Sequence, residues 1–314
     1  MTKHTFKGLV LYHAVMILIF GIMFVIGTFH DEEIAAAVYT PGNFIATAVT
    51  TVGIYPFFAA AVLFMGVLTE RAVHSDIKKP LKIVYCVLCA ALALYSGFKG
   101  SKTLMSVDCL GGIYPSLNRN MPVIICTSIA AAYPLFYIGF RIAAKNDDKL
   151  LAKKVLGLVI TMIAALVTME VLKDLFSRPR YRIAVRGYDG IGFVPWYSPF
   201  SGAADYVSAL GLEKTDFRSF PSGHSVIGIS CIYIFMSLAW LFPGLKGKQG
   251  MLCIFGSVFG IIVMFTRMLL GAHYLSDVSA GAAIGTLLSF VFILIQHNII
   301  MKKYPALAEI QRYE

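Results

Sequence analysis

Two histidines in the C-terminal third of the chain stand beside residues that could make one of them a nucleophile. His273 and Asp277 are four residues apart, so they share one face if the segment is helical. A carboxylate that accepts the Nδ1–H of an imidazole fixes its tautomer and leaves Nε2 available for attack. The alternative is an ordinary ion pair at a helix junction, and the spacing alone does not choose between the two.

The second histidine, His224, closes a Pro-Ser-Gly-His run that begins at Pro221. Proline suits the first turn of a helix, and the free N–H groups of that turn form a cradle for anions. Ser222 would add a hydroxyl donor, and Gly223 would let the backbone approach a ligand closely. A histidine at a helix start can also be a cap or a surface residue, but the four-residue run favours a site.

Cations accompany both histidines. Lys173 lies near the end of a predicted membrane helix, where a lysine either serves a function or extends to the interface. Arg178, Arg180 and Arg182 follow it, which favours an anion site because guanidinium groups bind phosphate in a fork. Arg267 lies inside an apolar stretch, close to its predicted outer end.

Together these residues supply a nucleophile with an orienting acid, a second histidine and several cations. Phosphoryl transfer needs little else, because positioning and charge neutralisation dominate its catalysis. The sequence has no acidic cluster that indicates a required Mg²⁺ site, so we predict neither a metal nor another cofactor.

The elements that must position these groups are membrane helices. The chain has 314 residues, 58% of them hydrophobic and only 14% charged. An average soluble domain is about 45–50% apolar and about 25% charged, so lipid is the expected solvent. We predict eight spanning stretches, with boundaries at roughly 8–29, 44–69, 80–98, 121–141, 155–176, 223–242, 251–271 and 278–300. The first of them is predicted to be a retained helix rather than a cleaved signal.

The net charge of +10 is a topology signal. Most basic residues fall in alternate loops of the eight-helix chain, which places these loops and both termini in the cytoplasm and leaves nucleic-acid binding without support. The first loop on the other side is acidic and has no Lys or Arg. The basic residues concerned are Lys3, Lys7, Arg71, Lys78, Lys79, Arg141, Lys145, Lys149, Lys153, Lys154, Lys246, Lys248, Lys302, Lys303 and Arg312.

The longest polar interval, residues 177–222, is predicted to lie on the non-cytoplasmic side. It contains Trp196 and Tyr197, aromatic residues that favour the headgroup region. The loop either rests on the membrane or takes part in substrate access. Five of the six cysteines lie in apolar stretches as buried free thiols, and Cys109 lies in a predicted outer loop without an evident partner.

These motifs resemble the type 2 phosphatidic acid phosphatase (PAP2) family, which is related to vanadium haloperoxidases and glucose-6-phosphatase. The family pattern is K-x6-RP, PSGH and SR-x5-H-x3-D. Lys173 and Arg180 match the first motif, residues 221–224 the second, and Arg267, His273 and Asp277 the third. Two positions depart from the pattern: Tyr181 replaces a proline and Thr266 a serine. Neither change removes a charge or a catalytic group, so we expect activity to survive.

The resemblance implies a two-step hydrolysis. His273 would attack phosphorus, held in line by Asp277, and His224 would protonate the leaving oxygen. Water would then hydrolyse the phosphohistidine with His224 as base. The groups implied to bind the phosphate oxygens are Lys173, Arg180, Ser222, Gly223 and Arg267.

The predicted fold is all-α, a polytopic bundle of about eight membrane spans with the PAP2-like core in the last four. Family members usually have six helices, so residues 1–150 form N-terminal helices of unassigned role. Residues 151–304 form the catalytic membrane core, and residues 305–314 a cytoplasmic tail. We expect a bacterial cell-membrane enzyme with its site on the non-cytoplasmic side, acting on phosphatidate or an isoprenyl diphosphate such as the undecaprenyl carrier.

Two other functions fit parts of the pattern. One is a phosphatase for soluble esters that reach the outer face, which a comparison of lipid and sugar phosphates would separate. The other is a transporter or lipid-binding protein on the same scaffold. The helix count suits a transporter, but the complete set of catalytic residues argues against it.

Overall fold

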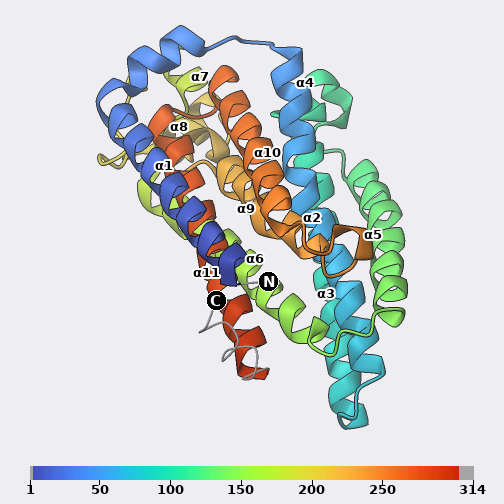
Figure 1. Ribbon diagram of the computed structural model, residues 1–314. Helices are drawn as coiled ribbons and strands as arrows, with labels where there is room; N and C mark the ends of the chain where they lie inside the picture. The colour runs from blue at the N-terminus through green and yellow to red at the C-terminus, as the bar shows by residue number, and fades with distance from the viewer. Residues whose placement is uncertain (1–2, 304–314) are drawn as a thin grey trace.

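The computed structural model describes residues 3–303, and this part of the chain is helical, with no strand (Figure 1). The predicted tail, 305–314, which includes Arg312, lies outside the described residues. The long helices are α1 (Lys3–Val38), α2 (Phe44–Val73), α3 (Lys79–Leu104), α5 (Met121–Ala144), α6 (Leu151–Phe176), α9 (Gly223–Leu238), α10 (Gln249–Leu269) and α11 (Leu275–Lys303). The short elements are α4 (Leu110–Ile113), η1 (Pro115–Leu117), α7 (Tyr181–Ala184), α8 (Ala203–Leu210), η2 (Lys214–Phe217) and η3 (Pro243–Leu245).

Each of the eight predicted stretches coincides with one long helix, which confirms the all-helical polytopic fold. Within residues 3–303, 7 helices are long and apolar enough to cross a membrane. The eighth, α9, has 16 residues and ends at Leu238, four residues earlier than predicted. Nearly all of its residues are buried against other helices. A helix that contacts protein rather than lipid need not match the full thickness of the bilayer.

Large apolar side chains point outward along the long helices. Leu18 is 63% exposed, Ile45 73% and Tyr133 75%. Such exposure is unfavourable in water but suits a lipid-facing surface, where the backbone polar groups are already paired within each helix. The chain is therefore an integral membrane protein.

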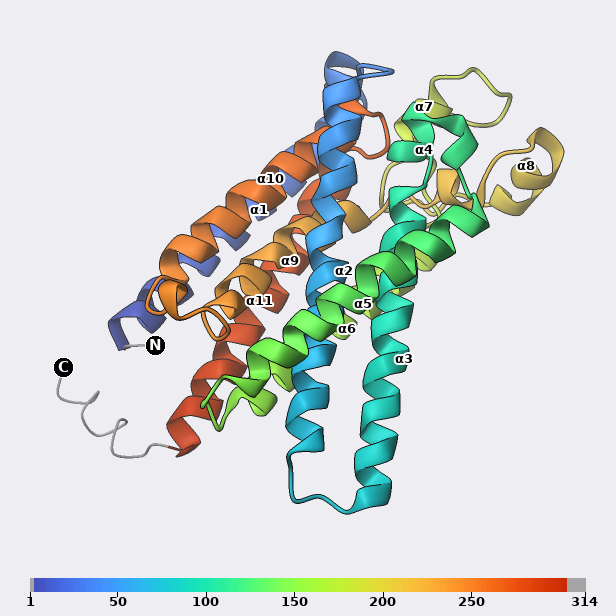
Figure 2. The same ribbon diagram turned by 90° about the vertical axis from the view of Figure 1, so that its right-hand side faces the viewer.

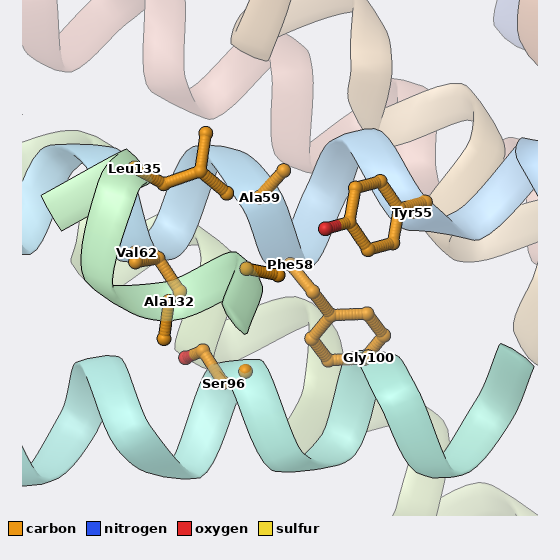
Figure 3. A pocket seen from close by; sticks show the side chains of 10 residues that line it. Tyr55, Phe58, Ala59, Val62, Ser96, Gly100, Ala132 and Leu135 are labelled. Atoms are coloured by element: carbon orange, nitrogen blue, oxygen red, sulfur yellow. The ribbon is translucent and has the colours of Figure 1, made fainter. Parts of the chain in front are cut away.

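Polar and small residues join the helices inside the bundle. Nε2 of His13 on α1 is hydrogen-bonded to the Ser289 hydroxyl on α11 at 2.8 Å, and both side chains are buried. Helices α2, α3 and α5 meet through small residues instead. Figure 3 shows Ala59 of α2, Gly100 of α3 and Ala132 of α5 among the residues around a small gap lined mainly by apolar groups. Small residues of this kind let membrane helices approach closely.

The two ends of the bundle differ. Helices α4, α7 and α8 gather at one end, which we call the α7 end, together with the long 177–222 segment (Figure 2). The α2–α3, α5–α6 and α9–α10 connections lie at the opposite end. These connections carry the basic residues 71–79, 141–154 and 246–248, so the alternation of charged loops predicted from the sequence is preserved in the fold.

Candidate active site

Four helix ends bring the predicted site residues to the α7 end. Lys173 lies in the last turn of α6, and Arg180 immediately precedes α7. Ser222 is the N-cap of α9, so Gly223 and His224 open that helix. The third motif straddles a helix junction, with Arg267 in the last turn of α10, His273 in the connection, and Asp277 in the first turn of α11.

The charged side chains among these residues form one cluster. The imidazole of His224 has Arg267, Asp108, His273 and Lys173 as its charged or titratable neighbours. Arg180 and Arg267 are likewise neighbours of His273. The structure thus brings together both histidines and all three cations that the motifs singled out.

Several nitrogen atoms of this cluster have no hydrogen-bond partner in the described part of the chain. Among the described residues, the buried side-chain atoms without a partner include Nε2 of His224, Nε2 of His273, Nε of Arg180, and both Nε and Nη1 of Arg267. A buried polar group left unpaired costs about 1–3 kcal/mol, so several of them at one place mark a candidate ligand site. Several cationic nitrogens beside two imidazoles suit an oxyanion of the size of phosphate.

His273 is held in a defined tautomer by the backbone. Its Nδ1 lies 2.7 Å from the carbonyl oxygen of Ser219, which can only accept, so Nδ1 carries the hydrogen and Nε2 presents a lone pair. Burial, with the nearby charges of Arg180 and Arg267, lowers the pKa of His273 to about 3, although Asp277 opposes the shift. The ring is neutral at pH 7, as a nucleophile requires.

The sequence-based interpretation of Asp277 was wrong in its geometry. His273 precedes α11, so the two residues do not share a helical face, and Nδ1 lies 3.7 Å from Asp277 Oδ2. Asp277 Oδ2 instead accepts from the Ser219 hydroxyl at 2.5 Å and from the Tyr274 N–H at 2.9 Å. The carboxylate therefore fixes Ser219, and the carbonyl of Ser219 fixes the imidazole.

Ser222, Gly223 and Lys173 meet at the start of α9. The Ser222 hydroxyl oxygen accepts from the N–H of Ser225 at 3.3 Å and from its hydroxyl at 2.9 Å, so its own hydrogen remains available for an anion. A Cβ at Gly223 would lie 2.5 Å from Met169 Sδ and 2.9 Å from Lys173 Nζ. The absence of a Cβ thus lets the ends of the Met169 and Lys173 side chains pack directly over the start of α9.

Arg178, one of the three arginines expected at an anion site, is fully buried elsewhere in the structure. Its Nη1 donates to Asp277 Oδ1 at 2.6 Å and its Nη2 to Asp31 Oδ2 at 2.9 Å. Its Nε donates to the carbonyl of Val194 at 2.7 Å, and the guanidinium stacks 3.9 Å above the Tyr274 ring. Every nitrogen is used, so Arg178 supports Asp277 and does not face the cluster.

Sequence reasoning missed two carboxylates from the N-terminal half. Asp31 follows a break in the helical geometry of α1 at His30, and its Oδ1 accepts from the N–H of Ser276 at 2.8 Å. Asp108, between α3 and α4, binds three arginines. Asp31 belongs to the acidic loop that indicated topology, and Asp108 had no neighbouring motif to mark it.

The two departures from the family pattern lie outside the cluster. Tyr181 packs edge-to-face on Tyr39 and Tyr274. The Thr266 hydroxyl lies 2.8 Å from that of Thr50 on α2 and donates to the carbonyl of Val263. Trp196, in the long loop, donates from Nε1 to the Thr28 hydroxyl at 3.0 Å and stacks on the Phe220 ring, so this loop is tied to α1.

Comparisons with known proteins identify a family for the part of the chain that carries this cluster. The PAP2 superfamily model matches residues 154–301, a range that includes every predicted site residue. Residues 154–301 form a PAP2 superfamily domain.

Two curated proteins are similar to this chain, and both are named as phosphatases. Lipid phosphate phosphatase 2 of Arabidopsis thaliana is 28% identical over 195 residues, which cover 57% of this chain and 63% of the relative. Phosphatidylglycerophosphatase B of Bacillus subtilis is 37% identical over 75 residues, or 23% of this chain and 36% of the relative. The chain thus spans less than two thirds of the length of either relative. No solved structure matches it significantly.

Proposed function

We propose that this protein is a membrane phosphatase that hydrolyses a lipid phosphate or diphosphate through a phosphohistidine intermediate. The observation that carries the proposal is the set of buried, unpartnered nitrogens on His224, His273, Arg180 and Arg267. An anion with several oxygens would satisfy them at once. The names of the two curated relatives, both phosphatases of lipid phosphates, support the same class of substrate.

In the first step, the lone pair of His273 Nε2 attacks phosphorus and the bond from phosphorus to the leaving oxygen breaks. His224 enters this step protonated and gives its Nε2 proton to that oxygen, so its ring becomes neutral and the leaving oxygen departs protonated. The cations Lys173, Arg180 and Arg267 hold the three equatorial oxygens, with the Ser222 hydroxyl and the Gly223 N–H beside them. Such preorganised donors stabilise the charge of the transition state most effectively in a buried site.

In the second step, neutral His224 accepts a proton from water as the oxygen attacks phosphorus. The bond between phosphorus and His273 Nε2 breaks, which regenerates the neutral imidazole and releases inorganic phosphate. The Nδ1–H of His273 stays bonded to the Ser219 carbonyl throughout. Asp277 acts indirectly, because it fixes Ser219 and offsets the positive charge that develops on the phosphorylated ring.

The location of the cluster supports an amphiphilic substrate on the non-cytoplasmic side. It lies at the ends of helices whose outer faces are apolar, at the end of the bundle away from the basic loops. A phosphate at this depth can reach the histidines while acyl or isoprenyl chains stay in lipid. Phosphatidate and the isoprenyl diphosphates are the proposed substrate class, and a bacterial cell membrane is the proposed location.

The test is phosphate release by the full chain purified in detergent, with phosphatidate, undecaprenyl diphosphate, phosphatidylglycerophosphate and glucose 6-phosphate as substrates. We expect release from at least one lipid, inhibition by vanadate, and no loss with EDTA. His273→Ala should abolish turnover, because no other group supplies the nucleophile. His74→Ala, which removes a largely exposed imidazole at the opposite end, is the matched control.

Undiminished phosphate release by His273→Ala would refute the mechanism. Faster hydrolysis of glucose 6-phosphate than of every lipid would instead favour a phosphatase for soluble esters. Vanadate binding without hydrolysis of any substrate would point to a non-catalytic lipid-binding or transport protein.

A further inference from the structure

The segment between α3 and α4 inserts a carboxylate among the arginines of the PAP2 domain. Asp108 Oδ2 accepts from Arg180 Nη1 at 2.8 Å and from Arg267 Nη2 at 2.6 Å, and Oδ1 is bonded to Arg182 Nη1. Asp108 is only 8% exposed. It lies outside residues 154–301, so the domain match does not include it.

The local backbone is folded tightly enough to fix this carboxylate. A Cβ at Gly111 would lie 2.6 Å from the Met105 carbonyl oxygen, and one at Gly112 would lie 2.2 Å from that of Val107. Cys109, which follows Asp108 in the chain, is fully buried. Because α4 folds back on the residues before Asp108, the side chain has little freedom to withdraw from the arginines.

Asp108 offsets part of the positive charge of Arg180, Arg182 and Arg267. Arg182 is shared with a second carboxylate, because its Nη2 is bonded to Asp216 at 3.2 Å. These arginines keep a net positive charge, which suits a phosphate monoester that carries roughly −1.5 to −2 at pH 7. Although burial opposes ionisation, the three guanidinium groups hold the pKa of Asp108 well below its usual range.

The contacts of Asp108 leave part of each phosphate-binding arginine unused. Arg180 keeps Nε without a partner, and Arg267 keeps Nε and Nη1. A carboxylate that blocked the site in place of phosphate would be expected to occupy these nitrogens. Asp108 instead holds one η nitrogen of each group and leaves the others available.

We propose that Asp108 is a positioning residue, supplied by the N-terminal half, that orients Arg180 and Arg267 for the transferred phosphate. The proposal rests on the function proposed above, in which these two arginines bind the phosphate oxygens. It gives residues 1–150 a part in the site: their helices carry the connection that presents this carboxylate to the domain. Asp108 itself does not touch the substrate.

The test compares Asp108→Asn with Asp216→Asn in the full chain in detergent. Both residues are 8% exposed carboxylates bonded to Arg182, but Asp216 makes no side-chain contact with Arg180 or Arg267 in the described part of the chain. Isothermal titration with orthovanadate measures binding, phosphate release measures kcat and KM, and thermal unfolding measures stability. We expect Asp108→Asn to weaken vanadate binding and lower kcat by about 10–100-fold, the range typical of partners that orient ligand-binding groups.

Asp216→Asn should change both quantities by less than about threefold, since it leaves the Asp108 contacts intact. In the double variant Asp108→Asn/Arg267→Gln, the loss of vanadate binding should be smaller than the sum of the two single losses, because part of the effect of Asp108 passes through Arg267. If Asp108→Asn does not fold, Asp108→Glu keeps the charge and displaces the bonded oxygen, and weaker vanadate binding is again expected.

Unchanged or tighter vanadate binding by the folded Asp108 variant would overturn the proposal, as would an equal loss in Asp216→Asn. Tighter binding with faster turnover would identify Asp108 as an inhibitory plug instead. Failure of the phosphatase function is a separate result. In that case the wild type releases no phosphate from any substrate, yet the vanadate titration still decides whether Asp108 positions the arginines.

Discussion

Arg178 and Arg267 are both fully buried arginines at the α7 end, but their surroundings differ. Every nitrogen of Arg178 donates to a protein acceptor, two of them to the carboxylates of Asp31 and Asp277. Arg267 uses only Nη2, bonded to Asp108, and leaves Nε and Nη1 without partners. Residue type and burial are the same in both cases. The two arginines differ in how many guanidinium nitrogens have a hydrogen-bond acceptor, and this difference separates a structural arginine from one that is proposed to bind a ligand.

The comparison also explains how the two halves of the chain cooperate. The PAP2 domain supplies both histidines and the cations proposed to bind phosphate, whereas the N-terminal half supplies Asp31 for Arg178 and Asp108 for Arg267. A buried charge without a partner is costly, so each arginine needs its acid to be stable where it is. Substitution of Arg178 should therefore mainly lower the stability of the protein, whereas substitution of Arg267 should mainly weaken ligand binding.

The largest effect is expected for Arg178→Gln. This change leaves Asp31 and Asp277 buried without their shared cation, and removing one partner of a buried ion pair costs about 3–5 kcal/mol. Thermal unfolding in detergent should show a large loss of stability, with turnover reduced because Asp277 no longer fixes Ser219. Arg186→Gln, an exposed arginine in the same segment, is the control and should stay within about 0.5 kcal/mol of wild type. Wild-type stability of Arg178→Gln would break the distinction between the two arginines.

Arg267→Gln should have the opposite profile. Loss of one preorganised donor typically lowers kcat by about 10²–10³-fold, or about 2.7–4 kcal/mol of transition-state stabilisation. Asp108 keeps Arg180 and Arg182, so the fold should tolerate the change better than that of Arg178. Phosphate release and the melting temperature, measured on the same preparation, check both parts. A variant that unfolds as readily as Arg178→Gln, or that keeps its full turnover, would contradict this assignment.

The contrast between the arginines also marks what sequence can and cannot predict. Apolar runs of about 20 residues were enough to predict all eight long helices, because a chain in lipid has few alternatives to a helix. The motif residues met as expected because each lies near a helix end on the same side. The run Arg178-Pro-Arg180 gave no sign that its two arginines face different partners. Asp31 lies 147 residues from Arg178, and Asp108 lies 159 residues from Arg267. Neither pairing can be read from the local sequence, since such contacts depend on tertiary packing.

The smallest effect is expected at a position where the sequence departs from its family. Thr266→Ser restores the family serine next to Arg267, keeps the hydroxyl that meets Thr50, and removes one buried methyl group. The loss should stay below about 1 kcal/mol, near the value of one buried CH₂, with kcat unchanged. Thr266→Val, which removes the hydroxyl and keeps the shape, should cost a similar amount, about 0.6 kcal/mol for an average interhelical hydrogen bond in a membrane.

Thermal unfolding and phosphate release of the two Thr266 variants separate packing from catalysis. The Thr266 side chain points to α2 and contacts none of the unpartnered nitrogens, so stability should change slightly and turnover not at all. A severalfold rise in kcat for Thr266→Ser would mean that this residue acts on Arg267 after all. The number of hydrogen-bonded guanidinium nitrogens would then be an incomplete guide to the role of an arginine.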